Sequence, residues 1–334
     1  MAKKKATAAK KRKTRAAAPV QETAAVLPPQ KPVFKYKNLL AIAVAVLIII
    51  SIFEVIPFVS GSFKKVKNPA LLYSWTHNYG GCTSISECGP NIYGIDNTRG
   101  DIYVNEKVAG TFLKKVTIPE GVLTISGDSA GNIFVLDRKN EILKLDPKTF
   151  KTVKKTALEG AGNYSWMDID SKDNFYAANS STQQIVKFNS SFVKTGAFGG
   201  PGGGREGFDY LGKIAAGPGD DIYALNFLKD RKLEIKVFTS DGKYKYNWTA
   251  DSMKSIDSYS GIAVAPDGDV YLSSMNDAAV YVYSAQGRHL GTFNQDDAKT
   301  FTITYIASIC GGRNGVIYVA TSKMAAFGVI NYGK

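Results

Sequence analysis

A short pattern of alternating apolar and polar positions recurs along the chain, and it predicts the fold. The phrase Gly-Asp/Asn-Ile/Val-Tyr/Phe-Val occurs six times, centred on the aromatic residues Tyr103, Phe134, Tyr176, Tyr223, Tyr271 and Tyr318. The steps between these residues are 31, 42, 47, 48 and 47 positions. A period of this length is typical of one supersecondary unit that is repeated along a chain.

Each copy of the phrase follows an apolar run and a polar turn, and most copies precede two further alternating runs. Four strands in forty to fifty residues are typical of a propeller blade, so the pattern predicts an all-β, six-bladed β-propeller over residues 70–334. The short first step predicts that the first blade lacks a regular outer strand. The sixth unit ends after its third strand, and we expect residues 70–76 to supply its outer strand.

One copy resembles an NHL repeat along most of its length. The stretch 198–225 matches the NHL pattern in order at Phe198, Gly199, Gly207, Phe208, Ile214, Asp221, Ile222 and Tyr223. The chain therefore resembles the NHL-repeat propeller family from about Tyr73 to its C-terminus. It departs from the family pattern elsewhere, because the Asp that usually closes the signature is kept only as Asp137. The resemblance implies a six-bladed propeller, and a fold alone implies no activity.

The N-terminal part of the chain has a different composition. Residues 1–38 hold eleven Lys or Arg against one acid, Glu22, and so contribute +10 of the formal net charge of +13. This segment is predicted to be a disordered cytoplasmic tail, because it has too little apolar surface to offset its conformational entropy. Residues 39–59 carry Glu54 as their only charge and are long enough for one transmembrane helix. A linker is predicted over 60–69.

The charge on either side of the apolar segment predicts its orientation. Eleven basic residues precede it and three, Lys64, Lys65 and Lys67, follow it closely, which places the N-terminus in the cytoplasm. The prediction is therefore a single-pass protein of the cell membrane with its propeller on the extracytoplasmic side. The alternative is a cleaved signal peptide that releases a soluble secreted propeller, although the basic region is longer than such signals normally have.

Cysteine usage fits an extracytoplasmic location. Cys82 and Cys88 lie six residues apart in a stretch rich in Gly, and we expect them to form a disulfide. Cys310 falls in the first strand of the sixth unit and is expected to be a buried apolar residue.

The sequence favours a protein that is not an enzyme. Its two histidines, His77 and His289, lie where neither suits a catalytic triad. A divalent-metal hydrolase or lyase on the same propeller is the alternative, with Asp96, Asp128, Asp168 and Asp170 as candidate ligands near the innermost strands. Such residues more often form turns, so no metal and no cofactor are predicted.

Two other binding functions are disfavoured. The glycine-rich loop 199–207 lies between predicted strands, whereas a phosphate-binding loop opens a helix. The net charge resides in the tail, and the remaining residues are nearly neutral, so the propeller is not expected to bind nucleic acid. The tail is better suited to the anionic membrane surface.

The remaining candidate is a binding surface at one mouth of the propeller channel. Residues about ten positions before each signature aromatic should lie at that mouth, together with large aromatic residues nearby. These candidates are Tyr93, Trp166, Tyr210, Lys213, Tyr259 and Tyr305. Aromatic side chains at an open mouth suit contact with a protein or glycan partner. The prediction is a membrane-anchored binding or scaffold module.

Overall fold

The computed structural model describes residues 71–76, 82–107, 110–158, 162–256, 261–294, 306–311, 316–321 and 325–330. All of them belong to one compact unit, Val59–Lys334. The predicted tail (1–38), transmembrane segment (39–59) and linker (60–69) lie outside the described residues. Within the described ranges, no helix has the length and apolar character needed to cross a membrane.

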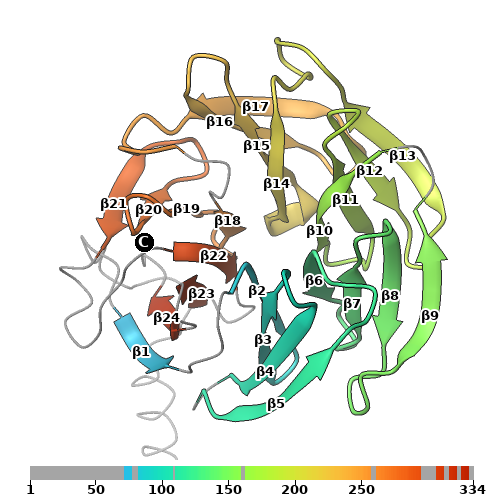
Figure 1. The fold of residues 1–334 in the computed structure, drawn as a ribbon. Helices are drawn as coiled ribbons and strands as arrows, with labels where there is room; N and C mark the ends of the chain where they lie inside the picture. Colours follow the sequence, from blue (N-terminus) through green and yellow to red (C-terminus); the bar gives the residue numbers. More distant parts are fainter. Residues whose placement is uncertain are drawn as a thin grey trace, which may run out of the picture. The chain divides into compact units, whose positions relative to one another are not determined.

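The described strands form six antiparallel sheets of four strands each, arranged around a centre (Figure 1). The innermost strands are β2 (Ser84–Cys88), β6 (Thr124–Gly127), β10 (Tyr164–Ile169), β14 (Leu211–Ala216), β18 (Gly261–Val264) and β22 (Ile306–Gly311). The second strands are β3 (Asn91–Asp96), β7 (Ile133–Leu136), β11 (Phe175–Asn179), β15 (Ile222–Phe227), β19 (Val270–Ser274) and β23 (Val316–Thr321). A single 3-10 turn, η1 (Pro218–Asp220), precedes β15.

The third and fourth strands extend each sheet outwards. The third strands are β4 (Asp101–Glu106), β8 (Glu141–Leu145), β12 (Gln184–Phe188), β16 (Leu233–Phe238), β20 (Ala279–Tyr283) and β24 (Ala325–Ile330). The outer strands are β5 (Phe112–Thr117), β9 (Thr152–Ala157), β13 (Lys194–Gly199), β17 (Tyr244–Thr249), β21 (His289–Phe293) and β1 (Leu71–Thr76). The prediction of an all-β propeller is therefore confirmed.

Five of the sheets are blades of four consecutive strands, whereas the sixth sheet is assembled from both ends of the described chain. Its order is β1-β24-β23-β22, and β1 pairs antiparallel with β24 from Leu71 to Thr76. Residues 70–76 were predicted to supply this strand, and the pairing confirms that prediction. Each innermost strand contacts the next, and β22 contacts β2, so the innermost strands form a closed ring.

The repeat prediction was wrong in the first blade by one strand. Tyr103 lies in the third strand, and the residue equivalent to the other signature aromatics is Tyr93, which pairs with Ser86 as Phe134 pairs with Ser126. The true step from Tyr93 to Phe134 is 41 residues, close to the other steps. The first blade consequently has room for a regular outer strand, β5, which was predicted to be missing.

The predicted disulfide between Cys82 and Cys88 is also wrong, since both thiols are free. Strand β2 occupies most of the interval between them, and an extended strand rises about 3.3 Å per residue. The two Cα atoms are therefore about 20 Å apart along the chain direction, against roughly 6 Å in a disulfide. The Cys82 thiol donates instead to the Ser84 carbonyl at 3.1 Å, and the Cys88 thiol donates to the Asn132 carbonyl at 3.5 Å.

Neighbouring blades make a recurring contact at their outer edges. The outer strand of one blade reaches the turn between the third and fourth strands of the next blade. Each such turn has one residue with a positive φ; these residues are Gly110 (68°), Phe150 (60°), Phe192 (66°), Gly242 (85°) and Gly287 (83°). This contact, which we call the rim junction, fastens successive blades together.

The rim junctions are of two kinds. At the first two, the outer strand supplies a lysine: the Lys114 ammonium lies 4.0 Å from the Phe150 ring centroid, and the Lys154 ammonium lies 4.6 Å from that of Phe192. At the next two, the outer strand supplies an aromatic ring, from Phe198 or from Trp248. A Cβ added to Gly242 would approach Phe198 to 2.7 Å, and one added to Gly287 would approach Trp248 to 2.5 Å.

Candidate functional site

The innermost strands enclose a cavity of about 570 Å³ at the centre of the propeller. All six innermost strands contribute residues to the cavity wall, so no single repeat reveals the site. Its exposed lining residues include Ser129, Ser171, Pro218 and Pro266, which follow the ends of innermost strands. The cavity therefore opens on the face that carries the turns between first and second strands.

The cavity wall has a polar half and an apolar half. One position in each innermost strand lies opposite the signature aromatic of the second strand, and these residues are equivalent. In chain order they are Ser86, Ser126, Asp168, Ala215, Ala263 and Cys310. The first three blades thus present hydroxyl and carboxyl groups, whereas the fourth and fifth blades and the composite sheet present methyl and thiol groups.

Asp168 is the central polar group of this wall, and its carboxylate joins three blades. Its Oδ1 accepts hydrogen bonds from the Ser126 hydroxyl at 3.1 Å and from the Ile169 N–H at 2.9 Å. Its Oδ2 accepts one from the Ala216 N–H at 2.8 Å. Burial raises the pKa of this carboxyl, and the charge of Asp170 adds to the increase, although the three donors act against it.

Two of the predicted mouth residues lie together. The Lys213 ammonium is 4.6 Å from the ring centroid of Trp166, a cation–π contact between β14 and β10. Trp166 lines the cavity at the end opposite to the open turns, since it lies near the start of its strand. Lys213 also acts electrostatically on the Cys82 thiol, whose pKa burial raises to about 12.

Two other candidates, Tyr93 and Tyr210, are not brought to this pair. Tyr93 is buried in the second strand of the first blade, where its ring packs 6.1 Å from that of Phe150, so its prediction as a mouth residue was wrong. Tyr210 is 51% exposed, and its ring packs 6.1 Å from Phe227. Tyr259 and Tyr305 lie outside the described residues.

The carboxylates that were weighed as metal ligands are mostly engaged in turns. Asp128 accepts from the backbone N–H groups of Ala130 and Asn132, and Asp170 accepts from those of Lys172 and Asn174. Asp170 also receives the Tyr176 hydroxyl at 2.9 Å. Among the described residues, no group of three or more His, Cys, Asp or Glu is arranged to hold a metal ion.

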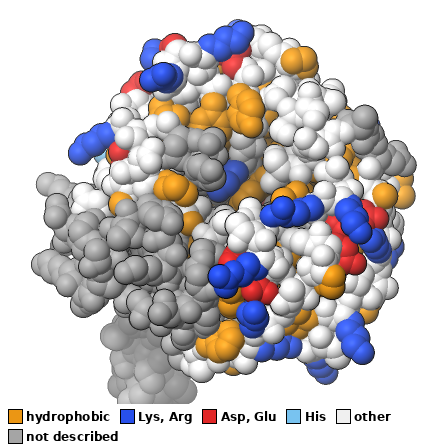
Figure 2. Space-filling model, in the orientation of Figure 1, with side chains coloured by type: hydrophobic (Ala, Val, Ile, Leu, Met, Phe, Trp, Pro, Cys, Tyr) orange, Lys and Arg blue, Asp and Glu red, His pale blue; other side chains and the backbone are white. Residues whose placement is uncertain are grey.

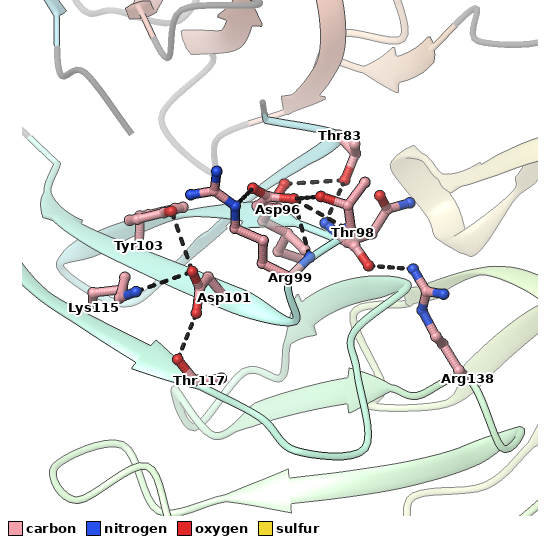
Figure 3. Close-up of polar contacts among 11 residues, drawn as sticks. Thr83, Asp96, Thr98, Arg99, Asp101, Tyr103, Lys115, Thr117 and Arg138 are labelled. Carbon is pink, nitrogen blue, oxygen red and sulfur yellow. Dashed lines mark hydrogen bonds and ion pairs between the residues drawn. The ribbon is translucent and has the colours of Figure 1, made fainter. Parts of the chain in front are cut away.

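Asp96 belongs to a polar cluster at the edge of the first blade (Figure 3). It accepts from the Thr98 N–H at 3.0 Å and pairs with the Arg99 guanidinium at 3.7 Å. Nearby, Asp101 accepts from the Thr117 hydroxyl and from the Lys115 ammonium, which lies at 3.1 Å. Burial raises the pKa of Asp101, but these donors outweigh it, so the pKa lies below its ordinary value. The cluster stabilises a blade edge and is remote from the cavity wall.

The glycine-rich loop was correctly predicted to be a connection between blades, because it links β13 to β14. Its carbonyl groups surround the ammonium of Lys236, a side chain only 2% exposed. That ammonium donates to the carbonyls of Gly204 and Gly207, the latter at 2.6 Å, and lies 3.4 Å from the Glu234 carboxylate. A phosphate site needs inward N–H groups, whereas this loop presents carbonyl groups to a cation.

The sequence did not predict that Lys236 is buried among loop carbonyl groups, nor that the cavity wall has a polar half and an apolar half. No contact was predicted for Lys236, because its partners lie 29 to 32 residues earlier in the chain. The wall could have been found by aligning the innermost strands on the residue opposite each signature aromatic. On the face shown in Figure 2, apolar side chains lie near the centre beside a few Lys or Arg side chains, and other Lys and Arg side chains lie towards the edge.

The polar and apolar groups that line the cavity are suited to binding a ligand. Among the described lining residues, the Asp168 carboxylate has three fixed donors, and the described histidine, His289, lies on an outer strand. Burial raises the pKa of the Cys310 thiol, so no thiolate nucleophile forms there near neutral pH. Neither the protein-family models nor the curated proteins that were searched contain a match to this chain.

Proposed function

We propose that this chain is a membrane-anchored binding module. Residues 39–59 span the cell membrane once, residues 1–38 lie in the cytoplasm, and a six-bladed, NHL-like propeller lies on the extracytoplasmic side. The propeller binds a protein or glycan partner at the end of the channel where Trp166 and Lys213 lie, opposite to the face with the open turns. The membrane placement rests on the apolar segment and on the excess of basic residues before it.

The observation that carries the binding role is the stacked pair of Trp166 and Lys213 at one end of the central cavity. Both side chains come from innermost strands, which are held in a closed ring, so the pair is positioned by rigid elements. A half-buried tryptophan beside a cation presents a flat apolar face and a charge at little entropic cost, as binding hot spots do.

The test is capture of a crosslinked partner from native membranes by the full chain and by Trp166→Ala. We expect the variant to recover at least about tenfold less partner, because truncating a hot-spot tryptophan typically costs about 2 kcal/mol or more and about 1.4 kcal/mol is a tenfold change. Phe112→Ala is the matched control, since Phe112 is a 39% exposed aromatic residue on the outer strand β5. Full capture by Trp166→Ala with unchanged thermal unfolding would contradict the proposal.

A separate experiment tests the proposed membrane topology. Protease added outside intact cells should digest the propeller and leave the tail protected, and the mature N-terminus should still carry residues 1–38. A mature N-terminus that begins after residue 59 would instead indicate the secreted alternative.

A further inference from the structure

We propose that the central cavity binds a small amphipathic amine, with the ammonium group on Asp168 and the apolar part against the fourth blade, the fifth blade and the composite sheet. This inference concerns the interior of the cavity and goes beyond docking of a partner at the mouth. It does not require that docking to occur.

The first observation is the division of the wall. Ser86, Ser126 and Asp168 line one half at a single level, and Ala215 and Ala263 line the other half at the same level. At the level of the preceding residues the wall is apolar on all sides, through Ile85, Ile125, Met167, Ile214, Ile262 and Ile309. A ligand that satisfies both halves has a polar head and an apolar body, since a buried polar group needs a partner and apolar surface gains from leaving water.

The second observation is the charge of the polar half. Asp168 has no Lys or Arg partner within the described part of the chain, and its three donors are neutral. The other cavity acids are already matched: Glu87 pairs with Lys107 at 2.7 Å, and Asp170 receives four donors in its turn. Because a carboxylate offers about four lone-pair sites, Oδ2 of Asp168 keeps one for an entering donor.

The sign of the local field favours a cation over an anion. The Cys310 thiol, on the opposite side of the ring, has a raised pKa first through burial and then through the charges of Glu87 and Asp168. An ammonium donor would form a charge-assisted hydrogen bond with Asp168 in this field. A carboxylate ligand would meet charge of its own sign.

The size of the cavity sets the class of ligand. A volume of about 570 Å³ falls within the range of about 300–1,000 Å³ that holds organic molecules of moderate size. A bare metal ion would leave the apolar half without a partner. An aryl- or alkylamine fills both halves.

The experiment compares three probes that share a benzyl group: phenethylamine, phenethyl alcohol and phenylacetate. Binding of each to the purified full chain is measured by saturation-transfer NMR with competition. We expect phenethylamine to bind at least about tenfold more tightly than phenylacetate, the alcohol being intermediate, because one charge-assisted hydrogen bond contributes on this scale. Equal binding of amine and carboxylate would overturn the proposal, and this comparison needs no variant.

Variants assign the preference to one side chain. Asp168→Asn should remove the preference for the amine, and Asp168→Glu should keep it. Asp230→Asn, at an exposed turn between β15 and β16, removes the same formal charge away from the cavity and should change nothing. An unchanged amine preference in folded Asp168→Asn would overturn the assignment. Because Trp166 stays intact in these variants, loss of amine binding is distinguishable from loss of the macromolecular partner.

Discussion

The first two rim junctions and the next two fill the space between an outer strand and the neighbouring turn in opposite ways. At the first pair, the turn supplies the aromatic ring, from Phe150 or Phe192, and the neighbouring outer strand supplies a lysine. At the second pair, the outer strand supplies the ring, from Phe198 or Trp248, and the turn supplies a glycine. Each junction contains one large ring, but the ring comes from a different blade.

This difference shows at which turns a residue other than glycine tolerates a positive φ. A phenylalanine at positive φ costs about 1–2 kcal/mol relative to glycine. Phe150 and Phe192 occupy this conformation at 60° and 66° and are only 4% and 8% exposed. Burial of each ring offsets the local cost. Where the ring comes from the outer strand, only glycine leaves room for it, so glycine is required there for space as well as for conformation.

The largest expected effect is at the second kind of junction. Trp248→Ala removes a ring that packs 4.9 Å from Tyr283 and an indole N–H that donates to the Ala285 carbonyl at 3.1 Å. We expect a loss of about 3 kcal/mol in the free energy of unfolding, at the low end for tryptophan because the side chain is partly exposed. Urea denaturation measures it, and a loss below about 1 kcal/mol would contradict this account of the junction.

Gly287→Ala should cost about 2 kcal/mol, from the unfavourable φ of 83° and from the approach to Trp248. In a Trp248→Ala background the same change should cost only about 1 kcal/mol, because the steric part is gone. The double-mutant cycle therefore separates conformation from space. Strict additivity of the two changes would show that the ring does not restrict this position.

A smaller effect distinguishes two buried acids, Asp137 of the second blade and Asp101 of the first, which occupy different positions in their blades. Burial raises the pKa of Asp137, and the Glu141 carboxylate adds to the increase, whereas the donors around Asp101 hold its pKa low. A raised folded-state pKa means that stability is lost as pH rises from the unfolded value near 4 through the folded value. A lowered one means that stability is lost as pH falls through the folded value.

Asp137→Asn should therefore stabilise the protein at pH 7, by less than about 1 kcal/mol, because the amide donates one neutral hydrogen bond to Glu141. The gain should shrink as the pH approaches 4, and thermal unfolding at several pH values measures it. Asp96→Asn, at the equivalent turn of the first blade, should not stabilise, since Asp96 pairs with Arg99. A stability gain from Asp137→Asn that does not depend on pH would argue against an unfavourable interaction between the Asp137 and Glu141 carboxyl groups.

An effect of similarly small size is expected at the first kind of junction. Lys114→Ala removes an exposed cation–π contact with Phe150 and a hydrogen bond to the Lys148 carbonyl at 2.7 Å. We expect a loss of about 0.5–1 kcal/mol, as is usual for exposed contacts of this kind. A loss as large as that of Trp248→Ala would show that the lysine, and not the ring of Phe150, holds this junction.

Much of the fold could be predicted because the signature strands are buried and alternate regularly. The first blade was misread because Gly94 replaces an apolar residue in its true signature strand, while Asp101, Ile102 and Tyr103 give a better copy one strand later. The disulfide was misread because six residues between two cysteines fit a loop as well as a strand. Both errors arise from local spacing, which does not reveal the register of a sheet.

The candidate site was predictable only in part. Trp166 and Lys213 could be foreseen because each lies ten positions before a signature aromatic. The cage around Lys236 and the three-blade contacts of Asp168 could not, because they join residues about 30 to 50 positions apart that only the closed ring brings together. Phe150 at positive φ carries no sequence signal, since that position more commonly holds glycine.

Closure of the ring by β1 has a consequence for how the molecule could assemble. The backbone of β24 is covered on its outer side by a strand from the opposite end of the unit. Cleavage between β1 and β2 would expose an unpaired edge, which is a template for pairing with another chain. The same six residues, Leu71–Thr76, could then be supplied by a second copy. A nicked protein should accordingly form strand-exchanged dimers, visible by size-exclusion chromatography, where the intact chain forms none.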